Sequence, residues 1–427
     1  MNESEYYKRI NTLSCVYGPR VWDIRHELYF ILKKKNPFLR GLASLIRDSL
    51  RLYFVRKQSI ASNAIFFAIS LPGRSGWLSV GKAYAKIQEE GSCSAYVISA
   101  RNNINRLEGC SVTRLNPISL LQFIRAYIKA NSLINKSRNL NRYIVVLLYW
   151  RHLLWCDAWC NTIKGKNNVL ITHNDFDMAS FAGIKVFRSR GISINIQHGI
   201  PTDEFFPPNA DYQAVWGQKS KSIYSSYGVN RTRQLYWNPE HLKAKKGISS
   251  GDCPTCISFI SQTHTEIYGQ NMFRISKIFV ERMHEICISN DIEFKILLHP
   301  SECEYNSIPY QGNYQVSRPP HQIFSEHGAP TLLVGFSSTA FIDGHLSGHY
   351  ILGLSFSPLQ SKFAHELISP IHIANSSKEV LSVFKGLQNS KSKRKSFLEA
   401  QNLWYRSIVD GRSEVVEFAA EYLDHEK

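Results

Sequence analysis

The chain has 427 residues, of which 44% are hydrophobic and 20% charged, a balance typical of a globular protein. Its length exceeds that of one ordinary core and predicts two or three domains. The longest apolar runs, 143–150 and 64–69, span eight and six residues, whereas a helix that crosses a membrane needs about 20. The polar, acidic start of the chain argues against a secretory signal and predicts a cytoplasmic location.

Basic side chains outnumber acidic ones by 51 to 34, which leaves a formal net charge of +17. Such an excess suits a polyanionic partner: nucleic acid, an anionic membrane face or a phosphorylated substrate. No helix-turn-helix, zinc-finger or RNP-type pattern accompanies the charge, so we do not expect a nucleic acid partner. A basic, non-enzymatic nucleic-acid-binding protein is therefore the least favoured function.

The basic excess concentrates in residues 8–57, which hold 12 Lys or Arg against three acids. Apolar side chains interleave with the charges there: Leu39, Leu42, Leu45, Ile46, Leu50 and Leu52. The pattern is typical of an amphipathic helix on an anionic membrane surface, and it equally fits a solvated basic helix beside the first domain. We predict residues 1–60 as a basic amphipathic helical segment, and a protein that is cytoplasmic or peripheral at the inner face of the plasma membrane.

Nine cysteines are an odd number, unsuited to a complete disulfide framework, and a reducing compartment makes them structural. Cys253 and Cys256 have CxxC spacing but lack the second pair of ligands that a structural zinc site needs. We predict no metal site and no cofactor.

The first half of the chain repeats strand, polar turn and helix. Buried strands are predicted over 64–70, 95–99, 169–172 and 192–196, and helices over 78–90, 117–165 and 178–190, with Gly191 as a C-cap. The turn over 72–76 lacks the spacing of a dinucleotide fingerprint or a P-loop. This repeat is typical of a parallel sheet with right-handed crossovers.

The second half restarts the alternation after a Lys-, Gly- and Ser-rich linker. Strands are predicted over 256–260, 293–298 and 331–334, with helices near 378–387 and 396–423. We predict an α/β protein of two Rossmann-like domains facing a cleft. Its divisions are the helical segment 1–60, an acceptor domain 61–239, the linker 240–252, a nucleotide-sugar-binding domain 253–400 and a C-terminal helix 401–427.

Three groups of polar residues follow predicted strands, where open α/β sheets place their ligands. Asp175 and Asp177 follow the strand 169–172, and either could act as a general base. His198 competes for that role, since its ordinary pKa lies near neutrality. It stands between Gln197 and Gly199, which we assign to the acceptor side.

The other two groups lie in the second half. His299 and Pro300 end one strand, and Ser337, Ser338 and Thr339 precede a predicted helix. A histidine and hydroxyls at a helix start can bind phosphate, although Ser and Thr also serve as ordinary N-caps. Because both groups end strands of the same sheet, we expect them to converge on a nucleotide.

The pattern as a whole resembles bacterial GT-B glycosyltransferases of surface polysaccharide synthesis. The N-terminal half carries Gln197-His198-Gly199 and Asp211 to Gly217, and the later HP and Ser-Ser/Thr elements are similar to those of bacterial sialyltransferases and polysialyltransferases. CDP-glycerol and CDP-ribitol phosphotransferases and capsule Kdo transferases share related elements. The acidic motif departs from the sialyltransferase pattern, because only Asn174-Asp175-Phe176-Asp177 is present.

The resemblance implies a metal-independent transferase. It would move a CMP-activated sugar of sialic acid or Kdo type to a capsule, O-antigen or other surface polysaccharide, the acceptor being an oligosaccharide or lipid-linked glycan. The histidine and hydroxyls would hold the CMP phosphate, while an acidic residue of the N-terminal half activates the acceptor. The alternatives are a CDP-polyol phosphotransferase, with the histidine of the HG element as base, and a transferase for another nucleotide hexose.

Overall fold

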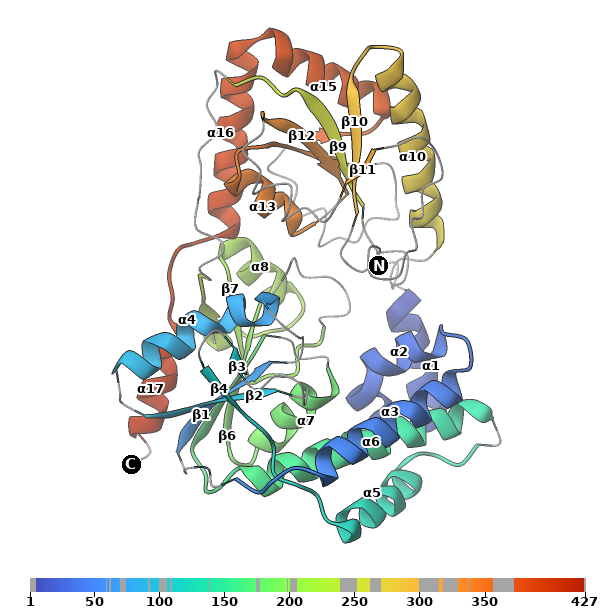
Figure 1. Cartoon of the computed structure of the whole chain (residues 1–427), viewed down its shortest axis with the longest axis vertical. Coiled ribbons are helices and arrows are strands. Elements are labelled where there is room, and N and C mark those ends of the chain that lie inside the picture. Colours follow the sequence, from blue (N-terminus) through green and yellow to red (C-terminus); the bar gives the residue numbers. More distant parts are fainter. Residues whose placement is uncertain are drawn as a thin grey trace.

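The computed structural model describes residues 5–425 apart from 59, 61–62, 70–73, 91–92, 100–105, 108–109, 138, 174–176, 198, 200–205, 239–251, 262–269, 299–314, 318–328, 337 and 356–371. Two α/β domains lie one above the other along the long axis (Figure 1). Each is built on a largely parallel sheet, with helices packed against it. The predicted fold class, two Rossmann-like domains in the GT-B arrangement, is therefore confirmed.

The N-terminal domain contains an eight-stranded sheet in the order β3-β4-β2-β1-β5-β6-β7-β8. Only the β3–β4 pair is antiparallel among these described strands. The strands are β1 (Ala64–Ile69), β2 (Ser94–Ser99), β3 (Arg106–Leu107), β4 (Cys110–Thr113), β5 (Asn168–Thr172), β6 (Gly191–Ile196), β7 (Tyr212–Val215) and β8 (Gln234–Tyr236).

Strand β1 shows why strands of this sheet are continuous apolar runs in the sequence. Ile65 and Phe67 belong to one core, which includes α4 (Arg74–Glu90), whereas Ala64 and Phe66 belong to the core on the opposite face. That second core includes α7 (Met178–Phe187). Because apolar cores cover both faces of the sheet, the residues on both faces of β1 are apolar, as expected of a buried parallel strand.

A helical layer extends the N-terminal domain. It consists of α1 (Glu5–Tyr17), η1 (Pro19–Ile24), α2 (Arg25–Leu32), α3 (Pro37–Tyr53), α5 (Leu120–Leu133) and α6 (Leu140–Thr162). The long helix α6 is buried on several sides because α3, α5 and α7 all pack against it. A capping box at Ser119 and Gln122 starts α5. The predicted helical segment 1–60 is thus part of the domain's main core.

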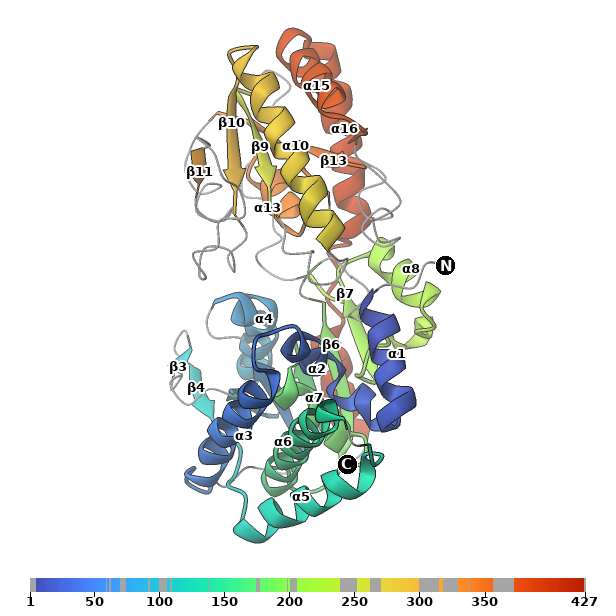
Figure 2. The ribbon, with the colours of Figure 1, turned by 90° about the vertical axis from the view of Figure 1, so that its right-hand side faces the viewer.

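The C-terminal domain has a six-stranded parallel sheet in the order β11-β10-β9-β12-β13-β14. Helices α10 and α15 are packed together on its outer side (Figure 2). The elements are β9 (Cys256–Ile260), α10 (Gln270–Ile288), β10 (Glu293–Leu297), β11 (Gln315–Ser317), β12 (Thr331–Gly335), α13 (Ala340–Leu346), β13 (Tyr350–Leu354), β14 (Ile373–Ala374), α15 (Ser377–Asn389) and α16 (Lys391–Ile408).

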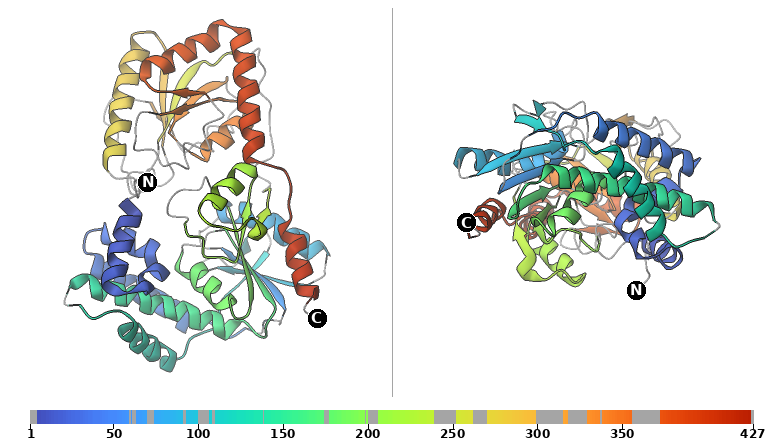
Figure 3. Two further views of the ribbon diagram at one scale, coloured as in Figure 1. Left: turned by 180° about the vertical axis from the view of Figure 1, so that it is seen from behind. Right: turned by 90° about the horizontal axis from the view of Figure 1, so that it is seen from below.

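The chain returns to the N-terminal domain after α16. The final helix, α17 (Val415–His425), packs beside α4, and Phe418 lies 4.6 Å from Tyr212 between ring centroids. Figure 3 shows this return from behind the molecule. The predicted helix 396–423 therefore corresponds to two helices, α16 and α17, joined by residues 409–414, which we call the crossing segment. Helix α16 also continues through position 400, where the sequence had suggested a domain boundary.

Two further sequence expectations change. Helix α4 already begins at Arg74, inside the predicted turn. Gly191 opens strand β6 instead of capping α7, which ends at Phe187. Its φ is +150°, and a Cβ there would lie 1.8 Å from the carbonyl oxygen of Asn168, so close strand packing requires glycine. The predicted linker 240–252 lies outside the described residues except for Asp252.

The described cysteines, Cys253 and Cys256 among them, carry free thiols. Within the described part of the chain, no helix is both long enough and apolar enough to cross a membrane.

Candidate active site

The carboxyl ends of β5, β6 and β7 meet at one edge of the first sheet. Thr172 pairs in register with Asn195, and Asn195 with Gln213. Their buried side chains form a row: Thr172 Oγ1 donates to Asn195 Oδ1 at 3.0 Å, and Asn195 Nδ2 donates to Gln213 Oε1 at 3.2 Å. Buried polar groups that satisfy one another fix the relative register of strands. This row holds the three strand ends together just before the candidate residues.

Gln197 fastens the turn that follows β6. Its Nε2 donates to the carbonyl oxygen of Gly199 at 2.9 Å, and its Oε1 accepts from the backbone N–H of Trp216 at 3.1 Å. The side chain is 1% exposed, so both ends of its amide are occupied inside the protein. These two buried hydrogen bonds hold the turn after β6 in place. His198, between these two anchored residues in the sequence, lies outside the described residues.

Asp177 occupies the start of α7. Its Oδ1 accepts from the backbone N–H groups of Ala179 and Ser180, each at 3.1 Å, so the carboxylate is the helix N-cap. Asp177 therefore has a structural role at the start of α7. Asp175 lies outside the described residues.

The second sheet also brings its candidate strands together. Strand β9 lies between β10 and β12, with Leu297 beside Ile260 and Val334 beside Phe259. Because all three strands are parallel, β10 and β12 end at nearly the same level of one sheet edge. The residues that follow them in the sequence, His299, Pro300 and Ser337, lie outside the described residues.

Ser338 and Thr339 lie at the start of α13. The Oγ of Ser338 accepts from the backbone N–H of Ala340 at 3.2 Å, and the Thr339 carbonyl accepts from the N–H of Ile342 at 2.9 Å. Both side chains are partly exposed. They therefore start a helix, as the sequence predicted, while remaining accessible.

The two sheet edges meet at Gly199 and Thr339. A Cβ built on Gly199 would lie 3.3 Å from Thr339 Oγ1. Gly199 follows β6 of the first domain, and Thr339 follows β12 of the second. The contact joins a residue assigned to the acceptor side with one assigned to phosphate binding. Residues 140 positions apart in the sequence are thus brought together.

An apolar core shared by the two domains holds the two sheet edges close together. It combines Trp216 and Tyr224 of the first domain with Phe341 of the second and with Trp404 and Ile408 of α16. All five side chains are at most 1% exposed. Helix α16 packs against both α13 and α8 (Gln218–Ser226), which explains how one helix fixes two domains.

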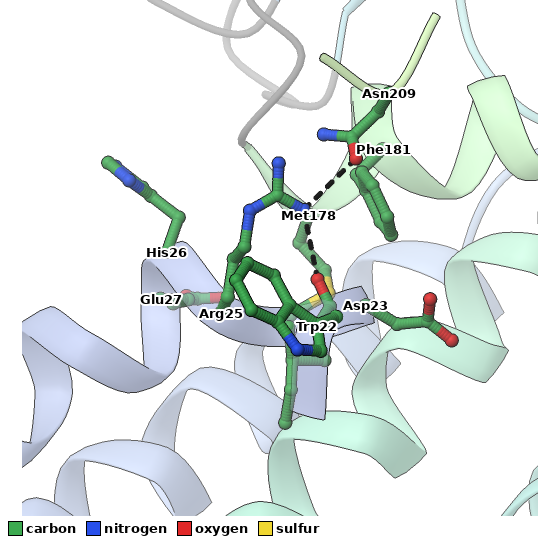
Figure 4. Close-up of a pocket in the computed structure, with 9 residues that line it drawn as sticks. Trp22, Asp23, Arg25, His26, Glu27, Met178, Phe181 and Asn209 are labelled. Atoms are coloured by element: carbon green, nitrogen blue, oxygen red, sulfur yellow. Dashed lines mark hydrogen bonds between the residues drawn. The ribbon is translucent and has the colours of Figure 1, made fainter. Parts of the chain in front are cut away.

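The sequence reasoning missed a pocket beside the start of α7 (Figure 4). Its cavity volume is about 10 Å³, and Trp22, His26, Met178 and Phe181 are among its lining residues. A volume of this size has room for about one water molecule. Arg25, 5% exposed, fixes one wall. Its guanidinium donates to the carbonyls of Trp22 and Pro207 and to the Oδ1 of Asn209, at 3.0, 2.8 and 3.0 Å.

This pocket adjoins the candidate residue Asp177, because Met178 follows it directly. Its walls come from η1, α2 and α7 and from the loop before β7. No motif spacing marks these residues, since they meet only when the N-terminal helices pack on the domain. Among the described residues, no cluster of three or more His, Cys, Asp or Glu side chains could hold a metal ion.

The chain matches no protein-family model and no curated protein sequence. Among solved structures, trehalose 6-phosphate synthase from Burkholderia multivorans shares 9% identity at a TM-score of 0.49, covering 86% of this chain and 96% of that one. The wall teichoic acid polymerase TagF shares 11% at 0.47, covering 92% and 98%. The S. aureus MnaA–UDP structure shares 11% at 0.46, covering 85% and 96%. These likenesses concern the fold.

Proposed function

We propose that the protein is a GT-B glycosyltransferase that moves a sugar from a nucleotide donor to a surface polysaccharide or oligosaccharide acceptor. The proposed donor is a CMP-activated sugar of sialic acid or Kdo type. The observation that carries this proposal is the close approach of Gly199 to Thr339. Gly199 follows β6 and Thr339 follows β12, so both lie beyond the carboxyl ends of parallel strands, where open α/β sheets bind ligands.

The transfer requires one bond to break and one to form. The bond between the sugar anomeric carbon and the phosphate oxygen breaks, the acceptor oxygen attacks that carbon, and a base takes the acceptor proton. We assign the departing phosphate to His299, Ser337, Ser338 and Thr339, whose donors would stabilise its charge.

We consider Asp175, Asp177 and His198 as candidates for the general base. Asp177 already accepts two backbone N–H groups as the N-cap of α7, which leaves Asp175 and His198 as the better candidates. Gln197 holds the turn that contains His198 in place, because its side chain bonds the carbonyl of Gly199 and the backbone N–H of Trp216.

A CDP-polyol phosphotransferase is the second candidate. The capping role of Asp177 favours it, because that reaction would use the histidine of the HG element as base and needs no aspartate. The two reactions differ in their product. A sugar transferase releases CMP and adds only the sugar mass, whereas a phosphotransferase adds the polyol together with a phosphate.

A donor screen on the purified protein tests the proposal. CMP-sialic acid, CMP-Kdo, CDP-glycerol and UDP-hexoses are each incubated with oligosaccharide acceptors, with and without a chelator, and nucleotide release and product mass are measured. CMP release that depends on acceptor is the expected result. UDP release alone would reject the CMP donor, and no release with any donor would reject the transferase.

Variants then test the assigned phosphate site. Ser338→Ala and His299→Ala should each raise the KM for the donor about tenfold, as expected when a hydrogen bond to a charged group is lost. Ser222→Ala, which removes an exposed hydroxyl bonded to Gln218 on α8, is the matched control. If both site variants keep full activity, the phosphate assignment is wrong.

A further inference from the structure

Helix α3 carries an apolar stripe on its solvent side. It packs on the protein through Gly41, Leu45, Asp48 and Leu52. At about 100° per residue, positions 39, 46, 50 and 53 lie on the opposite side of the helix. The residues there are all large and apolar: Leu39, Ile46, Leu50 and Tyr53. A solvent face would ordinarily be polar, so this helix presents apolar surface on two sides.

Helix α5 repeats the arrangement with an unrelated sequence. It packs through Ala126 and Ala130 and exposes five large apolar residues, Leu120, Leu121, Ile124, Tyr127 and Ile128. Together with the four on α3, these side chains are between 46% and 63% exposed. Scattered exposed apolar residues are normal, but two adjoining stripes on helices from distant parts of the chain are not.

The start of α5 lies beside the end of α3. The backbone N–H of Ile118, two residues before α5, donates to the carbonyl oxygen of Leu52 at 3.1 Å. Trp150 of α6 lies 4.9 Å from Tyr127 of α5 between ring centroids. Figures 1 and 2 show α3, α6 and α5 at the end of the N-terminal domain away from the C-terminal domain. We call the nine exposed side chains of α3 and α5, with Trp150, the basal surface.

Cations border the basal surface. Arg40, Arg47 and Arg51 follow one another along one edge of the α3 stripe, and Arg125 and Lys129 do so on α5. The only acid within α3 and α5 is Asp48, which is buried and paired with Arg151 and also with Arg47 and Arg51. On α6, the partly exposed Asp157 interacts with Lys129. The border is thus mainly basic, and an apolar centre with such a border complements a surface that is apolar inside and anionic at its rim.

We propose that the basal surface binds anionic lipid membranes, with α3 and α5 lying in the interface. The apolar stripes would enter the boundary between headgroups and acyl chains, and the cations would pair with lipid phosphates. The proposal stands apart from the transferase activity, because binding requires no donor.

The charges also decide between a membrane and a second copy of the chain. Two copies joined through the basal surface would bring their basic borders together, and like charges in contact oppose association. Lipid phosphates neutralise the same border. The membrane surface is therefore the occupant that fits both the apolar and the charged part.

Flotation of the full-length protein with vesicles tests the proposal. The vesicles are phosphatidylcholine alone or a mixture with phosphatidylglycerol, at low and high salt. The wild type should float with the anionic vesicles at low salt, and binding should fall at least fivefold in high salt or on neutral vesicles. Leu50→Asp and Ile128→Asp should each reduce binding tenfold or more. Leu403→Asp, on an equally exposed leucine of α16, should bind as the wild type does.

A second pair of variants separates charge from apolar contact. Arg125→Gln with Lys129→Gln should weaken binding and lower its salt dependence, while thermal unfolding stays unchanged because both side chains are exposed. The proposal is overturned if wild type and Leu50→Asp float alike. It is also overturned if the wild type ignores anionic vesicles and instead forms a dimer that Ile128→Asp dissociates. Turnover of a soluble acceptor by Leu50→Asp, measured without vesicles, tests the catalytic proposal separately.

Discussion

Gly199 and Thr339 meet across the two domains, with 3.3 Å between a Cβ placed on the glycine and Oγ1 of the threonine. Both residues are fixed from within their own domains. The carbonyl of Gly199 accepts a hydrogen bond from Gln197, and that of Thr339 accepts from the N–H of Ile342 in α13. Thr339 therefore leaves room for the hydrogen atom of Gly199 but little room for a methyl group at that position.

Gly199→Ala should reduce turnover about tenfold, because a displacement of even 1 Å between reacting groups is costly. It should also lower thermal stability. Adding Thr339→Ala removes the atom that the new methyl group meets, so the double variant should regain stability without regaining activity. A double-mutant cycle on the melting temperature measures this coupling. Additive effects on stability would show that the two residues do not touch.

Gly217 allows the crossing segment after α16 to lie against the first domain. A Cβ there would lie 2.3 Å from the carbonyl oxygen of Ile408, and the N–H of Asp410 donates to the Trp216 carbonyl at 2.8 Å. Gly217→Ala must displace rigid backbone and should cost about 1–3 kcal/mol in the free energy of unfolding. Denaturant titration gives that value.

Gly386→Ala is the matched control for Gly217. Its Cβ would meet only the flexible side chain of Lys393, at 3.3 Å. Alanine inside helix α15 should therefore stabilise the protein by about 0.5–1 kcal/mol. Equal losses of stability in both variants would contradict the role given to the crossing segment.

A buried ion network fastens the N-terminal helices. Arg151 of α6 donates to Asp48 Oδ2 at 2.6 Å and also pairs with Glu27, while Trp155 donates to the same Asp48 oxygen at 3.0 Å. Burial alone would raise the pKa of Asp48, but the charge and hydrogen bond of Arg151, with Trp155 and Arg47, hold it below its ordinary value.

Asp48→Ala should lower the free energy of unfolding by about 3–5 kcal/mol, because it leaves Arg151 buried with one partner removed. Glu421→Ala, which removes an exposed acid from α17, should change stability little. Urea unfolding of both variants makes the comparison. A loss of less than 1 kcal/mol for Asp48→Ala would show that the network contributes little.

His349 makes stability depend on pH. Burial lowers its pKa to about 4, and its Nδ1 accepts from the backbone N–H of Thr331 at 3.2 Å. The unfolded chain takes up a proton below the ordinary pKa of 6.5, whereas the folded protein does so only near 4. Stability from this group is therefore present above pH 6.5 and is lost as the pH falls from 6.5 to 4.

The burial of His345 also lowers its pKa to about 4, so it adds to the same slope. His349→Asn keeps an acceptor for Thr331 but does not titrate. Burial also lowers the pKa of His152, to about 3, so three histidines contribute to the slope. The variant should therefore lose about a third of the stability difference between pH 7.5 and pH 5, measured by urea unfolding. An unchanged slope would mean that other groups dominate in this range.

Strand positions were predictable because they depend on local pattern. The apolar run from Ala64, the run 169–172 and the run 256–260 each became a strand within one residue of the predicted ends. Buried parallel strands must be apolar on both faces, and few other structures require short apolar runs bounded by polar turns. The polar residues that follow these strands could be located in the sequence as well, because they come directly after the apolar runs.

The details of the candidate site were not predictable in this way. The sequence showed Gln197 as a polar residue near a strand end, but not that its side chain would be buried and bonded to the backbone of Trp216. The Arg25 pocket required the N-terminal helices to pack against α7. Both features depend on groups that are distant in the chain.

By itself, the sequence determined the class of fold, the alternation of strands and helices and the basic, amphipathic character of the first 60 residues, because periodicity and composition act over a few neighbouring residues. Only the tertiary structure decided that Gly199 meets Thr339, that the chain crosses back at Gly217, and that α5 adds a second apolar stripe beside α3. These features follow from which surfaces become buried against each other, and burial depends on the packing of the whole chain.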